Sequence, residues 1–495
     1  MKGFDILRVK SAVKSHSKMD LSRTHLTTMD FGQIVPLFSQ EVVPGDKFSV
    51  SGEFFSRMAP LVKPTFGRFS FKTVSAFVPY HQIAYDVDAF LAGKTSFEGQ
   101  TPVLRHITLE VLSYFIRTYC CDQTGATAVN CDYSVQSGTT GTIYYYLFTP
   151  TGRYWVKILN ALGYALPQSV DLRTSSHWQT LKSKKLSAMP LLAFFKLYND
   201  YMSQSQRFNT SQLSDILLKI KNGIDISGSF VASTGEIQSA CLNTMFSNLF
   251  LNYENDYFTS AWQNPNTPLG GPENVNVVAV PMDSRGDTVA HTGDSVYLNA
   301  RQGAGTNTTL ISQRALDFLR DFDNWVRRNN YSGSRSVQQL YSRFGIKTDE
   351  YRSHYAHVLN TDSLPIQVGD VTASADTTVA SLGSYAGKGV MSGNSGFDIE
   401  VSDHGMLFIL GYYTVTPMNP YGFDRSVLRS EPLDFYNPEF DGIGADAIPL
   451  MEFFENPLGF SEGDTTDSDD IFGFTERYNS ISGIASAPIP SNSGL

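Results

Sequence analysis

The sequence predicts a mainly β protein built from antiparallel strands, and three observations support this fold class. Residues 48–54 alternate apolar with polar side chains, which is the period-two pattern of a half-buried strand. Residues 66–78 form a second β-rich run, whose apolar members are Phe66, Phe69, Phe71, Val74, Phe77 and Val78. Turn residues at 44–46 precede the first run and prolines at 60–64 separate the two, which favours edge positions and wide loops over a parallel sheet.

Between residues 81 and 260 the apolar periodicity changes to that of helices. Apolar side chains recur at helical spacing in four segments, which predicts helices over residues 106–119, 153–165, 190–203 and 235–252. A β-like segment, residues 142–148, lies between the first two. No proline- or glycine-rich linker brackets this region, so we expect insertions between strands and not an independent helical domain.

Residues 265–312 have the composition of surface loops, with clustered Gly, Pro, Asn and Thr around one short apolar stretch. We expect a protrusion here; an ordered loop buried between neighbouring subunits is the alternative. Residues 313–330 then show a clear amphipathic helical pattern, and residues 336–344 predict a shorter helix.

Strands are expected again over residues 364–416, with Gly- and Ser-rich turns at 381–396 and a long final strand at 406–415. Pro417 and Pro420 should end that strand. The C-terminal residues 430–495 combine carboxylates with scattered aromatic side chains, which predicts an irregular, extended, acidic segment.

The composition indicates a globular chain, because 41% of the residues are hydrophobic and only 17% are charged. No run of eighteen apolar residues exists, so a membrane span is not expected. The four cysteines have no metal-ligand spacing and are expected to be free thiols in a reducing compartment. They are Cys120, Cys121, Cys131 and Cys241.

Motifs that would carry chemistry are weak. The two histidines of H-Y-A-H at 354–357 lack a third metal ligand at a recognisable spacing. The run G-V-M-S-G-N-S-G at 389–396 is neither a nucleophile elbow nor a phosphate loop, and is predicted to be a turn-rich loop. Residues 463–470 lack the central glycine and terminal glutamate of a calcium loop, so a solvated acidic loop is expected, with diffuse cation binding as the alternative. We expect no enzyme, no cofactor and no metal site.

The net charge of −10 is unevenly distributed along the chain. Residues 430–476 carry thirteen Asp or Glu and no Lys or Arg. The N-terminal residues 1–22, with Arg23 beyond them, are predominantly basic and lack hydrophobic periodicity, which predicts an extended arm. The arm is either a solvated terminus or a segment that contacts nucleic-acid phosphates without sequence preference. The opposite charges of the two ends suggest two environments, such as the two sides of a shell.

The block L-S-R-T-H-L-T-T-M-D-F-G-Q-I-V-P-L-F-S-Q-E-V-V-P-G-D-K-F at 21–48 resembles the N-terminal signature of the major capsid proteins of the Microviridae, which are small single-stranded-DNA bacteriophages. The likeness is closer to the gokushovirus-like branch than to the φX174-like one. Further segments resemble the family in the same order along the chain, at residues 189–202, 255–262, 331–346, 364–371, 404–417 and 472–478.

This resemblance implies a single eight-stranded antiparallel viral jelly roll with large α-helical and loop insertions between strands. Residues 1–22 would form a basic arm and residues 23–495 the jelly-roll domain, with helical insertions at about 81–260, a surface protrusion at about 265–312 and the acidic segment at 430–495. The family implies self-assembly, in the host cytoplasm, into a T=1 virion shell of about 60 copies around circular single-stranded DNA.

The resemblance also favours DNA contact as the role of the arm, through Lys2, Arg8, Lys10, Lys14, Lys18 and Arg23. It implies a small basic DNA-binding protein and a pilot protein as companions, and it allows a host cell-surface receptor. A jelly-roll attachment protein that grips a host glycan with residues 265–312 is the alternative function.

Overall fold

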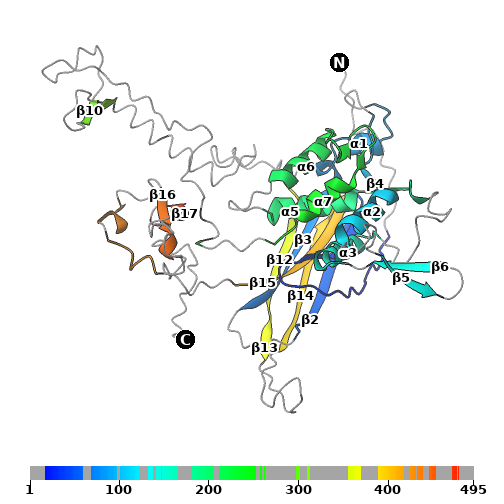
Figure 1. Ribbon diagram of the computed structural model, residues 1–495, viewed down its shortest axis with the longest axis horizontal. Coiled ribbons are helices and arrows are strands. Elements are labelled where there is room, and N and C mark those ends of the chain that lie inside the picture. The colour runs from blue at the N-terminus through cyan, green and yellow to red at the C-terminus, as the bar shows by residue number, and fades with distance from the viewer. Residues whose placement is uncertain are drawn as a thin grey trace, which may run out of the picture.

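The computed structural model describes residues 17–59, 68–96, 101–121, 132–137, 141–146, 148–164, 181–203, 211–251, 257–258, 261, 297–300, 309–312, 321, 355–369, 388–416, 423–430, 432–438, 445–452, 471–476 and 478. Most strands in this part of the chain pair antiparallel, and a group of helices lies over one face of the largest sheet (Figure 1). The predicted mainly β, antiparallel fold class is confirmed at this level.

The largest sheet has four strands in the order β1-β15-β3-β12, all antiparallel. Their bounds are β1 Ile34–Val42, β3 Phe69–Pro79, β12 His357–Pro365 and β15 Gly405–Val415. Pro36 lies on the edge strand β1 at a register shift, where its missing N–H is tolerated. The central strands β3 and β15 are buried over consecutive residues, which means that both faces of this sheet are covered.

The second sheet has three strands in the order β13-β14-β2. Their bounds are β2 Lys47–Arg57, β13 Gln367–Gly369 and β14 Lys388–Glu400. Exposed and half-buried residues alternate along the whole of β2, so the alternation read from residues 48–54 is confirmed. One face of this sheet is therefore open to solvent.

The prediction of turns at 381–396, and of a turn-rich loop at 389–396, is wrong for residues 388–396, which belong to β14. The glycines of this run serve close approach and not chain reversal. A Cβ atom on Gly393 would lie 2.6 Å from the Leu364 side chain of β12, and one on Gly396 would lie 2.9 Å from the carbonyl oxygen of Val50 in β2. Glycine is needed at these positions of β14 because the adjacent strands leave no room for a side chain.

The two sheets pack face to face as a sandwich. Phe77 and Leu407 of the four-stranded sheet share a hydrophobic cluster with Phe48 and Phe397 of the three-stranded sheet. Polar contacts also cross the interface, since the Asn360 amide of β12 donates to the Gly396 carbonyl of β14 at 3.1 Å.

Helices cover the opposite face of the four-stranded sheet (Figure 1). Their bounds are α1 Val87–Leu91, α2 Leu109–Phe115, α3 Pro150–Ala161, α5 Met189–Tyr201, α6 Ser211–Asn222 and α7 Ser239–Ser247. Side chains alternate between the two layers along each strand: Phe408 packs on the helices, whereas its neighbour Leu407 faces the second sheet. The largest hydrophobic cluster of the described residues therefore lies between helices and sheet.

The predicted helices at 153–165 and 190–203 are confirmed as α3 and α5, with small shifts of their ends. The other two were predicted too long, because short strands occupy their first residues. Thr108 ends β4 and caps α2 by accepting from the Val111 amide, and β9 precedes α7. The short strands are β4 His106–Thr108, β7 Lys185–Ser187, β8 Phe230–Val231 and β9 Glu236–Ile237. Sequence analysis missed α6, although its spacing of Leu213, Ile216, Leu217 and Ile220 carries the helical signal.

Short stretches of one-turn helix adjoin these elements. They are η2 Tyr80–Gln82, the π-helical segment η3 Ile116–Cys120, η4 Pro432–Asp434 and η6 Leu450–Glu452. The β-like segment at 142–148 is confirmed as β6, Gly141–Tyr146, paired with β5, Asp132–Ser137.

Two further strand pairs lie later in the chain. Within the predicted protrusion, β10 Tyr297–Ala300 pairs with β11 Thr309–Ser312. The remainder of that segment, and the predicted helices at 313–330 and 336–344, lie outside the described residues apart from Asp321.

In the acidic C-terminal segment, β16 Ala445–Pro449 pairs with β17 Ile471–Glu476. The prediction of irregular structure is wrong for the residues of these two strands. Ile448 and Phe472 of the pair pack with Tyr257 and Phe258 in a small separate cluster.

Candidate functional site

The basic N-terminal arm was the predicted site, and the structure describes it from residue 17 onward. Lys2, Arg8, Lys10 and Lys14 lie outside the described residues, so their predicted role stays a prediction. Lys18 lies in an exposed, extended part of the arm. Arg23 is held against the sandwich: its guanidinium donates to the Ser39 carbonyl at 2.6 Å and lies 4.4 Å from the Phe38 ring centroid. Arg23 thus fixes the arm to β1.

The arm and β2 frame a wide groove with a volume of about 2520 Å³. Its floor includes inward side chains of the sandwich such as Phe71, Ile409 and Tyr413. Charges of both signs line it, namely Lys18, Asp20, Arg23, Asp30, Asp46, Lys47, Glu53, Arg57 and Glu400. This mixture gives the groove no clear preference for an anionic ligand.

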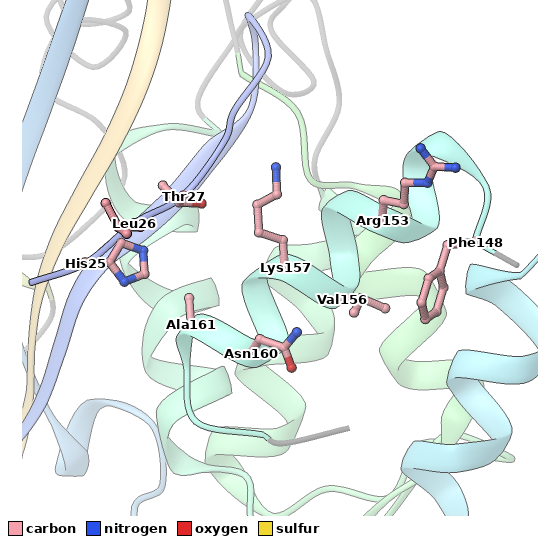
Figure 2. Close-up of a pocket in the computed structure, with 9 residues that line it drawn as sticks. All are labelled: His25, Leu26, Thr27, Phe148, Arg153, Val156, Lys157, Asn160 and Ala161. Carbon is pink, nitrogen blue, oxygen red and sulfur yellow. The ribbon is translucent and has the colours of Figure 1, made fainter. Parts of the chain in front are cut away.

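A smaller pocket of about 400 Å³ lies between the arm and α3, and it is different in character (Figure 2). Residues 25–27, which continue the chain from the arm toward β1, form one side and α3 forms the other. None of the nine described residues that line this pocket is acidic: they are His25, Leu26, Thr27, Phe148, Arg153, Val156, Lys157, Asn160 and Ala161. We call it the arm pocket.

The start of α3 is fixed by local sequence. The Thr149 hydroxyl caps the helix by accepting from the Gly152 amide at 3.0 Å, and Pro150 occupies its first turn. Gly152 packs directly on the backbone of Cys120, where any Cβ atom would overlap the Cys120 carbonyl. The helix therefore cannot rotate or shift without breaking this contact.

Burial on one side of α3 determines which side chains reach the arm pocket. Ile158 and Leu159 are fully buried, and the Tyr154 hydroxyl donates to the Ile34 carbonyl of β1 at 3.1 Å. Arg153 and Lys157, one helical turn apart, lie on the remaining face: Lys157 extends beside residues 25–27, whereas Arg153 lies at the start of α3 near Phe148 (Figure 2). The Lys157 amino group donates to the Thr28 carbonyl and thereby joins helix and arm.

Burial is the main influence on the basic groups of this region. Burial lowers the pKa of Lys157, and the nearby Asp30 carboxylate opposes that shift. Burial also lowers the pKa of His25, and the positive charge of Arg23 lowers it further. Burial thus disfavours the charged forms of Lys157 and His25, and the charge of Arg23 further disfavours protonation of His25.

Arg153 and Lys157 were not among the site residues predicted from the sequence. The available signal was a pair of cations at i and i+4 on the polar face of a predicted helix. Such pairs are usually solvated, and only the fold shows that the arm passes over this one.

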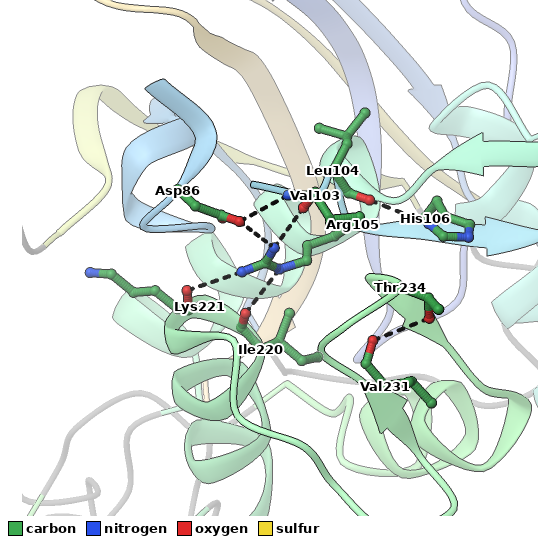
Figure 3. Close-up of polar contacts among 9 residues, drawn as sticks. All are labelled: Asp86, Val103, Leu104, Arg105, His106, Ile220, Lys221, Val231 and Thr234. Atoms are coloured by element: carbon green, nitrogen blue, oxygen red, sulfur yellow. Dashed lines mark hydrogen bonds and ion pairs between the residues drawn. The ribbon is translucent and has the colours of Figure 1, made fainter. Parts of the chain in front are cut away.

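A second cluster of charges is structural (Figure 3). Arg105, which is 1% exposed, donates to the Asp86 carboxylate at 3.1 Å and to the Val103 carbonyl at 2.6 Å. It also donates to the Ile220 carbonyl at the end of α6, at 3.1 Å. With its partners in place and almost no exposed surface, Arg105 ties α6 to the loop before β4 and cannot contact a ligand.

The described residues hold no group of three or more His, Cys, Asp or Glu side chains that could bind a metal ion. Cys120, Cys121 and Cys241 are buried, and burial raises the pKa of the Cys241 thiol to about 12. Of the two histidines at 354 and 357, His357 lies in β12 and the other is outside the described residues. No helix in the described part of the chain has the length and apolar character needed to cross a membrane.

Comparisons with known proteins cover most of the chain. The family described as "Capsid protein (F protein)" matches residues 8–126 and 175–482. The chain is similar to capsid protein VP1 of Chlamydia phage 1, with 23% identity over 527 residues that cover 95% of this chain and 83% of the relative. It is also similar to capsid protein VP1 of Bdellovibrio phage phiMH2K, with 20% identity over 485 residues that cover 95% of this chain and 81% of the relative.

Proposed function

This chain belongs to the capsid protein (F protein) family of Microviridae-like phages, and from this premise we propose that it self-assembles into a T=1 icosahedral shell of about 60 copies around circular single-stranded DNA. The resemblance of the sequence to gokushovirus-like coat proteins is confirmed by the two relatives. The observation that carries the proposal is the family match, which runs from the arm to the last strand pair.

We further propose that the sandwich is an eight-stranded jelly roll. The described strands support this because they pair in nested order: β1 pairs with β15, β2 with β14 and β3 with β12. A jelly roll arises when such a nested ladder folds into two sheets, and a fourth pair would complete it. That pair must come from between β3 and β12, the interval that also holds the proposed insertions at 81–260 and 265–312.

The proposed domain plan follows from this topology. Residues 1–22 form the arm, residues 265–312 form the outer protrusion around β10 and β11, and the acidic segment 430–495 lies away from the genome. The contrast between a basic arm and thirteen carboxylates without a cation at 430–476 supports opposite locations in the shell.

In this proposal the arm contacts packaged DNA through Lys2, Arg8, Lys10, Lys14, Lys18 and Arg23. Arg23 would contribute mainly by fixing the arm, because β1 already engages its guanidinium. The chain acts in the virion as a structural subunit and not as an enzyme, with assembly in the host cytoplasm and with a small basic protein and a pilot protein as companions. The glycan-binding alternative for residues 265–312 gains no support from the relatives, both of which are named capsid proteins.

The proposal is tested by expressing the full chain in a bacterial host with circular single-stranded DNA and the companion proteins. We expect closed particles of one size in electron micrographs, containing DNA that resists added nuclease. Subunits that remain monomeric with every partner present would refute the assembly. Closed particles without protected DNA would refute only the enclosure of DNA.

A further inference from the structure

We propose that the arm pocket binds a phosphodiester group of single-stranded nucleic acid, with Arg153 and Lys157 holding the phosphate and Phe148 contacting the adjoining base. The inference rests on the proposed enclosure of single-stranded DNA and adds a defined site to the diffuse contact expected of the arm. It assigns a role to residues of α3, more than one hundred positions away from the arm in the sequence.

The first argument is the unbalanced charge of the pocket. Arg153 and Lys157 stand at i and i+4, and like charges at this spacing destabilise a helix. In α6 the same spacing joins opposite charges, because Lys219 forms an ion pair with Asp215 at 2.6 Å. No carboxylate lines the pocket itself, and the acidic group that acts on Lys157 is Asp30 outside the lining, so the two cations leave a place for an external anion.

The second argument is the availability of donors. No hydrogen bond or ion pair engages the Arg153 guanidinium within the described residues, and its fork of N–H groups suits two phosphate oxygens. Lys157 donates to both the carbonyl and the hydroxyl oxygen of Thr28, but an ammonium group has three donors, so one remains for a ligand. Figure 2 shows Lys157 extending from α3 into the space beside the arm.

The third argument is the apolar part of the lining. Phe148 stands beside Arg153 at the start of α3 and Val156 lies on the same side of the pocket, while Leu26 lines the opposite side (Figure 2). A bare inorganic anion would gain nothing from these apolar side chains. Any of the four bases, in contrast, can stack on the Phe148 ring. A volume of about 400 Å³ is of the order that one nucleotide requires. The combination fits a single-stranded nucleic acid better than a free phosphate.

The test measures binding of a fluorescent oligothymidine of about twelve nucleotides to the full purified chain by anisotropy, at several salt concentrations. Arg153→Gln should weaken binding roughly tenfold and lower the salt dependence by about 0.7 in log–log slope, the value for one phosphate contact on a single strand. Lys219→Gln removes the same charge from another helix and is the matched control, with wild-type binding expected. Thermal melts of both variants establish that they fold.

Phe148→Leu separates a nucleotide site from a general anion site. It keeps an apolar side chain but removes the stacking surface, so oligothymidine should bind at least fivefold more weakly while competition by inorganic phosphate stays unchanged. Equal effects of Arg153→Gln and Lys219→Gln would overturn the inference. An unchanged oligothymidine affinity in Phe148→Leu would overturn its nucleotide part.

The two proposals fail in different ways. Shells that assemble and protect DNA equally well with Arg153→Gln and with wild type, together with unchanged oligothymidine binding, would remove the arm pocket and leave the capsid function intact. Pocket-dependent oligothymidine binding by a chain that never forms shells would retain the pocket and refute the assembly.

Discussion

The two sheets of the sandwich differ in how completely the chain covers them. The four-stranded sheet carries helices on one face and the second sheet on the other, and β3 and β15 are buried over consecutive residues. The three-stranded sheet has only one covered face, and even its inward residues on β2 are half-buried. Its β2 strand also borders the open groove beneath the arm.

The stability of an isolated subunit should therefore come mainly from the four-stranded sheet and its two covered faces. A sheet enclosed on both sides obtains its hydrophobic stabilisation from its own chain. A sheet with one solvent-exposed face and a partly open interior obtains less hydrophobic stabilisation from its own chain. Its exposed face is therefore the one suited to be buried by neighbouring copies. Substitutions in the two sheets should therefore differ strongly in their effect on the isolated subunit.

The largest effect is expected from removing a side chain between the four-stranded sheet and the helices. Phe408→Ala deletes a fully buried ring and should lower the free energy of unfolding by about 4–5 kcal/mol. Its counterpart Phe54→Ala, on half-covered β2, should cost only about 1–2 kcal/mol. Urea denaturation of the purified subunit measures both, and equal losses would contradict the comparison.

Loosening the helical layer should have the next largest effect. Arg105→Met leaves the Asp86 carboxylate buried without its cation, so we expect a loss of about 3–4 kcal/mol. Lys47→Met breaks an ion pair with Glu400 on the solvated face of the other sheet and should change stability by less than about 1 kcal/mol. Thermal denaturation of the two variants provides the measurement. A loss from Lys47→Met as large as that from Arg105→Met would show that the open face is not solvated.

A smaller difference is expected between two glycines. A Cβ atom on Gly405, at the start of β15, would overlap the Val78 carbonyl oxygen, so Gly405→Ala should cost about 2 kcal/mol. A Cβ atom on Gly52 of β2 would lie 3.3 Å from the end of the Phe54 side chain, which can move aside. Gly52→Ala should therefore cost less than about 1 kcal/mol by the same denaturation experiment. The reverse order would mean that β2 is packed more tightly than β15.

The smallest effect is expected on the bare face of the three-stranded sheet. Phe55 is 64% exposed there, so Phe55→Ser should change the stability of the isolated subunit by no more than about 0.5 kcal/mol. A shift of several degrees in the melting temperature of the subunit would show that this face is covered within a single chain.

Much of this architecture could be predicted because it follows from the local periodicity of apolar side chains. The alternation along β2 and the apolar stripes of α3 and α5 need no tertiary information. The strand β14 could not be predicted in the same way, because its glycines resemble those of a turn. Only the neighbouring Leu364 and the β2 backbone explain why that strand needs them.

The candidate site was less accessible to prediction. The basic character of the arm was visible in the sequence, and Arg23 does lie on the sandwich. The partner of the arm was not visible, since Lys157 and Thr28 are 129 positions apart and meet only in the folded chain. The Arg153 and Lys157 pair looks like any solvated helix face until the arm is placed above it.

The central claim is that this subunit is a shell component whose enclosed sheet supports a half-covered sheet that faces other copies. Cryo-electron microscopy of particles assembled from the full chain with single-stranded DNA tests it most directly. We expect closed icosahedral shells, with the arm and α3 toward the nucleic acid and a neighbouring copy over the three-stranded sheet. Discrete small oligomers, or shells in which that sheet faces only solvent, would contradict it.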